Sequence, residues 1–177
     1  MTDIYEKNES GQGFAAQIAR QFHIPRWEQL PSIDLYMDQL LVYIANSLGA
    51  YFACTGTAGL TKSMVNNYVK MGLVDRPDGK KYGRAQLAQL LMICMLKQAA
   101  SAEGMKQLLI PSEGEDIQAL YAHFCALQTE AFSVLSAELP GLSPMTCAVR
   151  NAGYRLLCNF ILTKDAAAAA SKEEETE

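Results

Sequence analysis

Five polar residues between Lys62 and Lys70 have the chemistry to contact nucleic acid. On a helical wheel at about 100° per residue, they share one arc with two lysines and no acid: Lys62, Ser63, Asn66, Asn67 and Lys70. Asparagine side chains can pair bidentately with adenine in the major groove, and a serine hydroxyl can reach a base or a phosphate. The two lysines would bind phosphates. A solvated helix face is the alternative interpretation, but it explains less well why acids disappear over this stretch.

A second basic group follows in the segment from Asp75 to Arg84. Its D-R-P-D-G run favours a turn, since proline fixes φ and Asp-Gly permits positive φ. Tyr82 is expected to pack at the base of this turn, with its hydroxyl available to a phosphate. Residues 61–84 hold six bases and two acids (+4), whereas the rest of the chain holds nine and seventeen (−8), so the basic footprint is local. Its basic residues would bind phosphates: Arg76, Lys80, Lys81 and Arg84.

A capped helix is needed to present the polar arc. Thr61 can cap its N-terminus by accepting a backbone hydrogen bond, and Gly72 lies where the helix would end. The opposite arc is apolar and would face a core: Met64, Val65, Tyr68 and Val69. Helix, short basic hairpin and the next helix, Ala85–Ala99, together describe a winged helix-turn-helix.

The first helix of this unit is expected over Ile33–Leu48, capped by Ser32 or Asp34. Its apolar residues recur at steps of three and four: Ile33, Met37, Leu40, Leu41 and Ile44. The segment Gly49–Gly59 is rich in Gly, Ala and Thr, and part of it is expected to be irregular or a short helix. Its T-G-T-A-G-L-T-K run lacks the spacing of a phosphate-binding loop.

Two resemblances cover this region. The run G-L-T-K-S-M-V-N-N-Y-V-K-M-G-L-V resembles the recognition helix of MerR-type regulators, K-K-Y-G-R-A-Q-L-A-Q-L-L-M-I resembles their wing end and next helix, and S-A-E-G-M-K-Q-L-L the helix after it. The whole of Ile24–Leu109, with I-P-R-W-E-Q-L-P-S-I-D-L-Y-M-D-Q, is similar to an uncharacterised bacterial family, the domain of unknown function 1836, thought to be MerR-like. The resemblance implies a DNA-binding fold.

The N-terminal part, residues 1–31, is expected to be an arm and a strap. Residues 1–13 should fray, Phe14–Phe22 could form a short helix, and His23–Pro31 should be extended because of its prolines. Trp27 is the only tryptophan. An anchor that pins the strap to the core is favoured over ligand stacking for this residue.

The C-terminal part is expected to form a helical hairpin over residues 111–164. Ser101 can cap a helix at Ala102–Leu109, and a capping box at Ser112–Glu115 would start a helix that runs to about Leu139. Ser143 and Pro144 would start the last helix, Met145–Leu162. Residues 165–177 should be a solvated, disordered acidic tail. An apolar seam in the first long helix could be a coiled-coil dimer interface or one side of the hairpin: Ile117, Leu120, Phe124, Leu127, Ala131 and Val134.

Catalytic constellations are poor. Only His23 and His123 are imidazoles, and neither has a recognisable nucleophile. The odd, scattered set of cysteines fits reduced, buried thiols better than disulfides or a metal site: Cys54, Cys94, Cys125, Cys147 and Cys158. No apolar run is long enough to span a membrane, and no secretion signal is recognisable. The sequence thus predicts a cytoplasmic protein that is not an enzyme and has no cofactor or bound metal.

The sequence predicts a mainly α protein, with a MerR-like winged helix-turn-helix and a small β wing over residues 32–110, followed by the helical hairpin. We expect a DNA-binding transcriptional regulator that binds double-stranded DNA as a homodimer. The alternative is a winged-helix protein-interaction module without DNA binding. The sequence identifies no effector.

Overall fold

Helix α4 (Arg84–Leu96) is the centre of the hydrophobic core. The computed structural model describes residues 24–111, 113–138 and 143–174, and within α4 all side chains from 87 to 94 are buried. A helix buried on every side must be apolar all round, as L-A-Q-L-L-M-I-C nearly is. Helices α2 and α6 pack against it. The predicted helix at 85–99 is confirmed, although it ends at Leu96. The predictions for Phe14–Phe22 and His23 concern residues outside those that the structure describes.

The segment before helix α2 differs from the prediction. Leu35–Tyr36 forms strand β1, and α2 runs from Met37 to Thr55. Ile33, predicted to begin this helix and its apolar face, lies before the helix and is 69% exposed. The Tyr36 N–H donates to Gln39 Oε1 (2.9 Å), which caps the helix in place of Ser32 or Asp34. Gly56, with φ 63°, ends α2, so seven residues of the Gly49–Gly59 segment, 49–55, belong to this helix.

Helix α3 (Lys62–Lys70) confirms its predicted signals. The Met64 N–H donates to Thr61 Oγ1 (3.2 Å), and Gly72 has a positive φ of 72°. The predicted hairpin is replaced by a longer-range pairing, because strand β2 (Lys81–Tyr82) is antiparallel to β1, with Leu35 opposite Tyr82. The turn before β2 contains a single bridge between Asp78 and Lys81. The chain is therefore mainly helical with a small two-stranded sheet.

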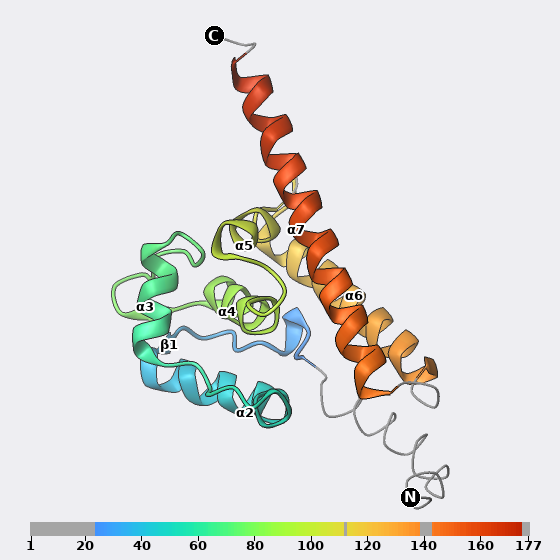
Figure 1. Ribbon diagram of the computed structural model, residues 1–177. Helices are drawn as coiled ribbons and strands as arrows, with labels where there is room; N and C mark the ends of the chain where they lie inside the picture. The colour runs from blue at the N-terminus through green and yellow to red at the C-terminus, as the bar shows by residue number, and fades with distance from the viewer. Residues whose placement is uncertain (1–23, 112, 139–142, 175–177) are drawn as a thin grey trace, which may run out of the picture.

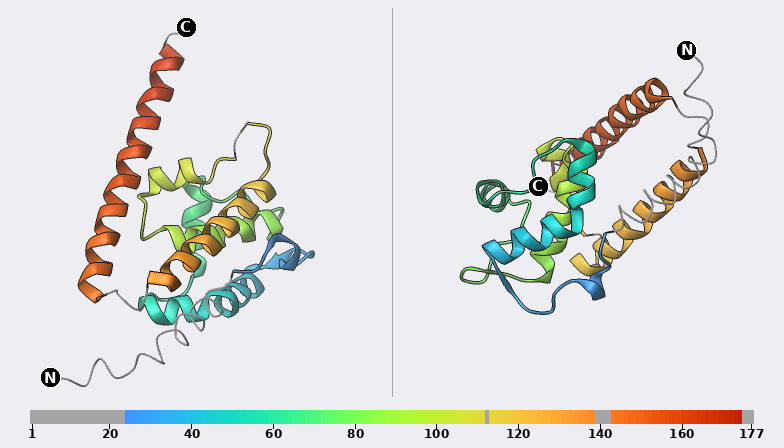
Figure 2. Two further views of the ribbon diagram at one scale, coloured as in Figure 1. Left: turned by 90° about the vertical axis from the view of Figure 1, so that its right-hand side faces the viewer. Right: turned by 90° about the horizontal axis from the view of Figure 1, so that it is seen from below.

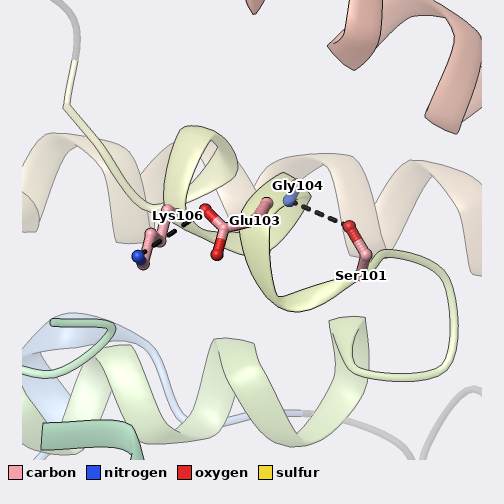
Figure 3. A network of polar contacts seen from close by, with 4 residues as sticks. All are labelled: Ser101, Glu103, Gly104 and Lys106. Carbon is pink, nitrogen blue, oxygen red and sulfur yellow. Dashed lines mark hydrogen bonds and ion pairs between the residues drawn. The ribbon is translucent and has the colours of Figure 1, made fainter. Parts of the chain in front are cut away.

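Two further helices continue the core. Figure 3 shows the start of α5 (Ala102–Leu108), where the Gly104 N–H donates to Ser101 Oγ (3.1 Å), as predicted, and Lys106 pairs with Glu103 (3.6 Å). Helix α6 (Ile117–Glu138) is capped by Asp116, whose Oδ1 accepts from the Ala119 N–H (2.9 Å). The predicted cap Ser112 lies outside the described residues, and the helix start predicted at Ser112–Glu115 is wrong because α6 begins only at Ile117. Tyr121 of α6 is fully buried.

Helix α7 (Pro144–Glu174) is longer than predicted. The Thr146 N–H donates to Ser143 Oγ (3.1 Å), which confirms the predicted cap. The predicted end at Leu162 is wrong, because the helix continues through the alanine run from 166 to 170, and alanine has the highest helix propensity. The C-terminal end of α6 lies near the N-terminal end of α7, the two long helices diverge from there, and α7 packs on α5 (Figures 1 and 2). No helix in the described part of the chain is long and apolar enough to cross a membrane.

Candidate nucleic-acid interface

The polar arc of α3 is on the surface, as the wheel predicted. All five of its side chains are exposed, and we call them the α3 polar face: Lys62, Ser63, Asn66, Asn67 and Lys70. Across the helix Val65 is fully buried, while Met64, Tyr68 and Val69 are half-buried. Burial on one side fixes the rotation of α3, so the polar face is available to a partner.

One acid lies beside this face that the sequence pattern did not indicate. Asp38, in the first turn of α2, forms an ion pair of 2.6 Å with Lys62, and both side chains are exposed, at 78% and 60%. An exposed pair of this kind contributes about 0–1 kcal/mol to stability. It nevertheless lowers the positive potential at the start of α3.

The turn between α3 and β2 presents three exposed basic side chains, which we call the basic turn: Arg76, Lys80 and Lys81. The Lys81 N–H donates to the Asp78 carbonyl oxygen (3.0 Å), and Gly79 has φ 60°. Glycine adopts this left-handed conformation with little strain. The predicted turn chemistry is therefore confirmed at this position.

Helix α4 holds the other end of the basic turn. Gln89, which is 7% exposed, accepts from the Asp75 N–H (3.1 Å) and donates to Asp75 Oδ2 (3.1 Å). Gln86 donates to the carbonyl oxygen of Arg76 (3.3 Å). Sequence reasoning missed both glutamines, because their partners lie 14 residues away for Gln89 and 10 for Gln86, which leaves no local signal. Their hydrogen bonds fix where the turn leaves the core.

The start of α2 connects the α3 polar face to the basic turn. Tyr36 is paired with Lys81 in the β1–β2 ladder, and the Lys81 Nζ lies 5.3 Å from the centroid of its ring. Two residues later, Asp38 binds Lys62 of α3. Helix α3 and the following loop accordingly lie at the same end of the molecule, away from α7 (Figure 1).

Two further residues of the predicted DNA-binding set, Tyr82 and Arg84, make contacts within the protein, and for Tyr82 the predicted packing at the base of the turn is confirmed. Tyr82 is only 5% exposed, so it packs in the core, and burial raises the pKa of its hydroxyl. Arg84 is half-buried: its Nε–H donates to the Pro31 carbonyl oxygen (3.4 Å), and its guanidinium lies 5.6 Å from the Trp27 ring centroid. These two residues support the strap and the base of the turn.

Trp27 is confirmed as an anchor of the strap. It lies in the short 3-10 helix η1 (Trp27–Gln29), is half-buried against the core, and its ring centroid is 6.3 Å from that of Tyr121. The Tyr121 hydroxyl donates to the Pro25 carbonyl oxygen (2.7 Å). The strap is thereby fixed to α6 and, through Arg84, to the start of α4.

The four cysteines whose side chains are described lie in different environments. Among the described side chains, Cys94 is buried, Cys125 and Cys158 are half-buried, and Cys147 is exposed, which corrects the expectation of a wholly buried set. Burial raises the pKa of the Cys94 thiol to about 11. Within the described residues, no three side chains of the metal-binding types come together.

The architecture thus defines a mainly helical protein with a two-stranded sheet and an exposed polar helix beside a basic turn. A family model described as "Domain of unknown function (DUF1836)" matches residues 25–124, more than half of the chain, so the chain belongs to this family. The match ends inside α6, and the rest of α6 and all of α7 lie beyond it. Neither the curated proteins nor the solved structures gave a significant match.

Proposed function

We propose that this protein is a DNA-binding transcriptional regulator with a MerR-like winged helix-turn-helix, acting in the cytoplasm as a homodimer. In this proposal α3 enters the major groove, and the basic turn is the wing that holds phosphates. Dimeric regulators of this kind bind two half-sites whose spacing matches the two copies.

The observation that carries the proposal is the joint placement of the α3 polar face and the basic turn. Asn66 and Asn67 are exposed on α3 and can read adenine. Lys80 and Lys81 are exposed on the adjacent turn and can neutralise phosphates. Helix α2 supports the α3 polar face and helix α4 supports the basic turn, which favours a preformed binding surface.

The test is fluorescence anisotropy with duplexes from the region upstream of the protein's own gene, across a salt series. Wild type is compared with Lys80→Ala/Lys81→Ala and with a control that loses the same charge elsewhere, Lys97→Ala/Lys106→Ala. We expect specific binding that weakens with salt. Loss of two phosphate contacts should make the slope of log K against log salt shallower by about 2 for the turn variant, whereas the control should match wild type. Equal losses in both variants, or no binding at low salt, would reject the proposal.

A protein-interaction module is the second candidate, and one feature near the same end favours it. Three apolar side chains within α2 or shortly before it are exposed, namely Ile33 at 69%, Tyr36 at 53% and Val42 at 60%. A shallow groove of about 440 Å³ beside them is lined by residues that include Pro31, Leu35 and Val42. This candidate would be supported if the protein does not bind DNA and if Val42→Glu abolishes the binding of a partner protein.

A further inference from the structure

The C-terminal helices expose an unusual amount of apolar side chain. Ten large apolar residues of α6 and α7 are between 48% and 72% exposed: Leu127, Val134, Leu135, Met145, Val149, Tyr154, Leu156, Leu157, Phe160 and Ile161. Together they expose on the order of 1,000 Å², compared with about 800 Å² per partner in a standard stable interface. The largest apolar patch on a typical monomer is only about 300–600 Å².

A groove separates the two helices where they diverge. It measures about 700 Å³, and its apolar lining includes Leu127, Val134, Leu135 and Tyr154. Arg150 of α7 pairs with Glu138 of α6 near its end. The groove is therefore mostly apolar, with the charged residues Glu130, Glu138 and Arg150 also in its lining, which suits an amphipathic helix.

Closure of α7 onto α6 within one chain would leave much of this surface exposed. Met145, Val149, Leu156 and Phe160 recur at steps of four and seven, so they share one side of α7. By the same periodicity, Tyr154, which lines the groove, and Leu162, which packs on the core, fall on other sides of the helix. A second chain is needed to cover the side that carries Met145 and Phe160.

The charges of the two helices are complementary. Helix α6 contains the acids Glu130 and Glu138 and no lysine or arginine, whereas α7 up to residue 164 contains Arg150, Arg155 and Lys164 and no acid. A two-fold dimer places the same patch of each copy against the other. Acidic α6 of one copy would then lie against basic α7 of its partner.

We propose that a second copy of this chain covers this surface, with α7 of each copy lying against α6 and the α6–α7 groove of the other. The inference specifies the interface of the dimer in the proposed function, but the assembly can be tested without DNA. Because α6 and α7 lie away from α3 (Figure 1), such a dimer would leave both α3 polar faces open.

A charge-exchange experiment on the full chain tests this pairing. One variant makes α6 basic, Glu130→Lys/Glu138→Lys, and another makes α7 acidic, Arg150→Glu/Arg155→Glu. Sedimentation equilibrium should show a wild-type dimer and, for each variant alone, a dissociation constant at least about tenfold higher. An equimolar mixture of the two variants should form a heterodimer. In it, the basic α6 of the first variant lies against the acidic α7 of the second, and the basic α7 of the first lies against the acidic α6 of the second. A monomeric wild type, or a mixture that stays as dissociated as its components, would overturn the inference.

Single apolar substitutions locate the interface. Leu156→Glu replaces a side chain that is 71% exposed, and Val42→Glu is its matched control on α2, at 60% exposure. We expect Leu156→Glu to be monomeric with unchanged circular dichroism and Trp27 fluorescence, and Val42→Glu to remain dimeric. Dissociation by Val42→Glu but not by Leu156→Glu would place the interface elsewhere. The variant Lys80→Ala/Lys81→Ala should remain dimeric, so loss of DNA binding and loss of the dimer can be distinguished.

Discussion

The carboxylate of Asp38 lies 2.6 Å from the ammonium group of Lys62, across the junction between the start of α2 and the start of α3. The Asp38 carboxylate places a negative charge at the edge of the α3 polar face, which itself contains no acid. Since both side chains are largely exposed, the attraction is screened by solvent and salt. The main consequence of Asp38 is therefore expected in the affinity for a polyanion rather than in the stability of the fold.

Substitution of Asp38 by asparagine should strengthen DNA binding. Removal of the carboxylate frees Lys62 for a phosphate, and we expect the dissociation constant at low salt to fall roughly two- to fivefold. Stability should change by less than about 0.5 kcal/mol. Anisotropy titrations measure the first effect and urea unfolding the second. Glu115→Gln, which removes an exposed acid before α6, is the control. An equal gain in affinity for both variants would mean that only net charge matters.

Substitution of Gln89 by alanine should destabilise the protein and release the basic turn. It removes the partner of the Asp75 N–H and of Asp75 Oδ2, and loss of such partners at a largely buried position costs about 1–3 kcal/mol. Urea unfolding measures this cost against Gln98→Ala, an exposed glutamine just beyond α4. If the two variants unfold at the same urea concentration, Gln89 does not hold the turn.

Local signals in the sequence predicted local structure correctly. Thr61, Ser101 and Ser143 were identified as caps, and each accepts the hydrogen bond expected of it. Each cap lies three residues from the N–H group that it binds, so periodicity and cap chemistry in the local sequence are enough to predict it. The exposure of the α3 polar face followed from the same periodicity.

Features that depend on distant residues were not predictable in this way. Leu35–Tyr36 lies within the helix predicted at Ile33–Leu48, but it forms a strand because β2, more than 40 residues later, offers a partner. Asp38 and Gln89 enter the candidate site only through tertiary contacts. The divergence of α6 and α7 is likewise set by the packing of α7 on α5.

The stability of the protein should fall at high pH through Cys94. Burial raises the pKa of this thiol from 9.0 to about 11. An unfolded chain therefore loses the proton first, and the stabilisation present below pH 9 disappears as pH rises towards about 11. The shift corresponds to roughly 2–3 kcal/mol. The measurement is the unfolding free energy across this range, under reducing conditions, for wild type and Cys94→Ala. Tyrosines titrate in both wild type and Cys94→Ala. Parallel curves of unfolding free energy against pH for the two proteins would therefore contradict the prediction.

A double-mutant cycle between Gly104 and Leu162 should detect the docking of α7 on α5. A Cβ built on Gly104 lies 2.9 Å from Leu162 Cδ1, so alanine at 104 requires Leu162 to move. This cost opposes the gain of about 0.5–1 kcal/mol expected from Gly→Ala in a helix. We therefore expect Gly104→Ala to be close to neutral in wild type and stabilising in the Leu162→Ala background, with a coupling energy of at least about 0.5 kcal/mol.

Gly49 of α2 provides the control for this cycle, because a Cβ there meets nothing within 4 Å. Gly49→Ala should stabilise the protein by the full helix-propensity gain in both backgrounds. Urea unfolding of all variants at one protein concentration gives the comparison, since association of the chain would otherwise alter apparent stability. If Gly104→Ala stabilises as much as Gly49→Ala whether or not Leu162 is present, then α7 is not held against α5. Its apolar surface would then be free to pack in another arrangement.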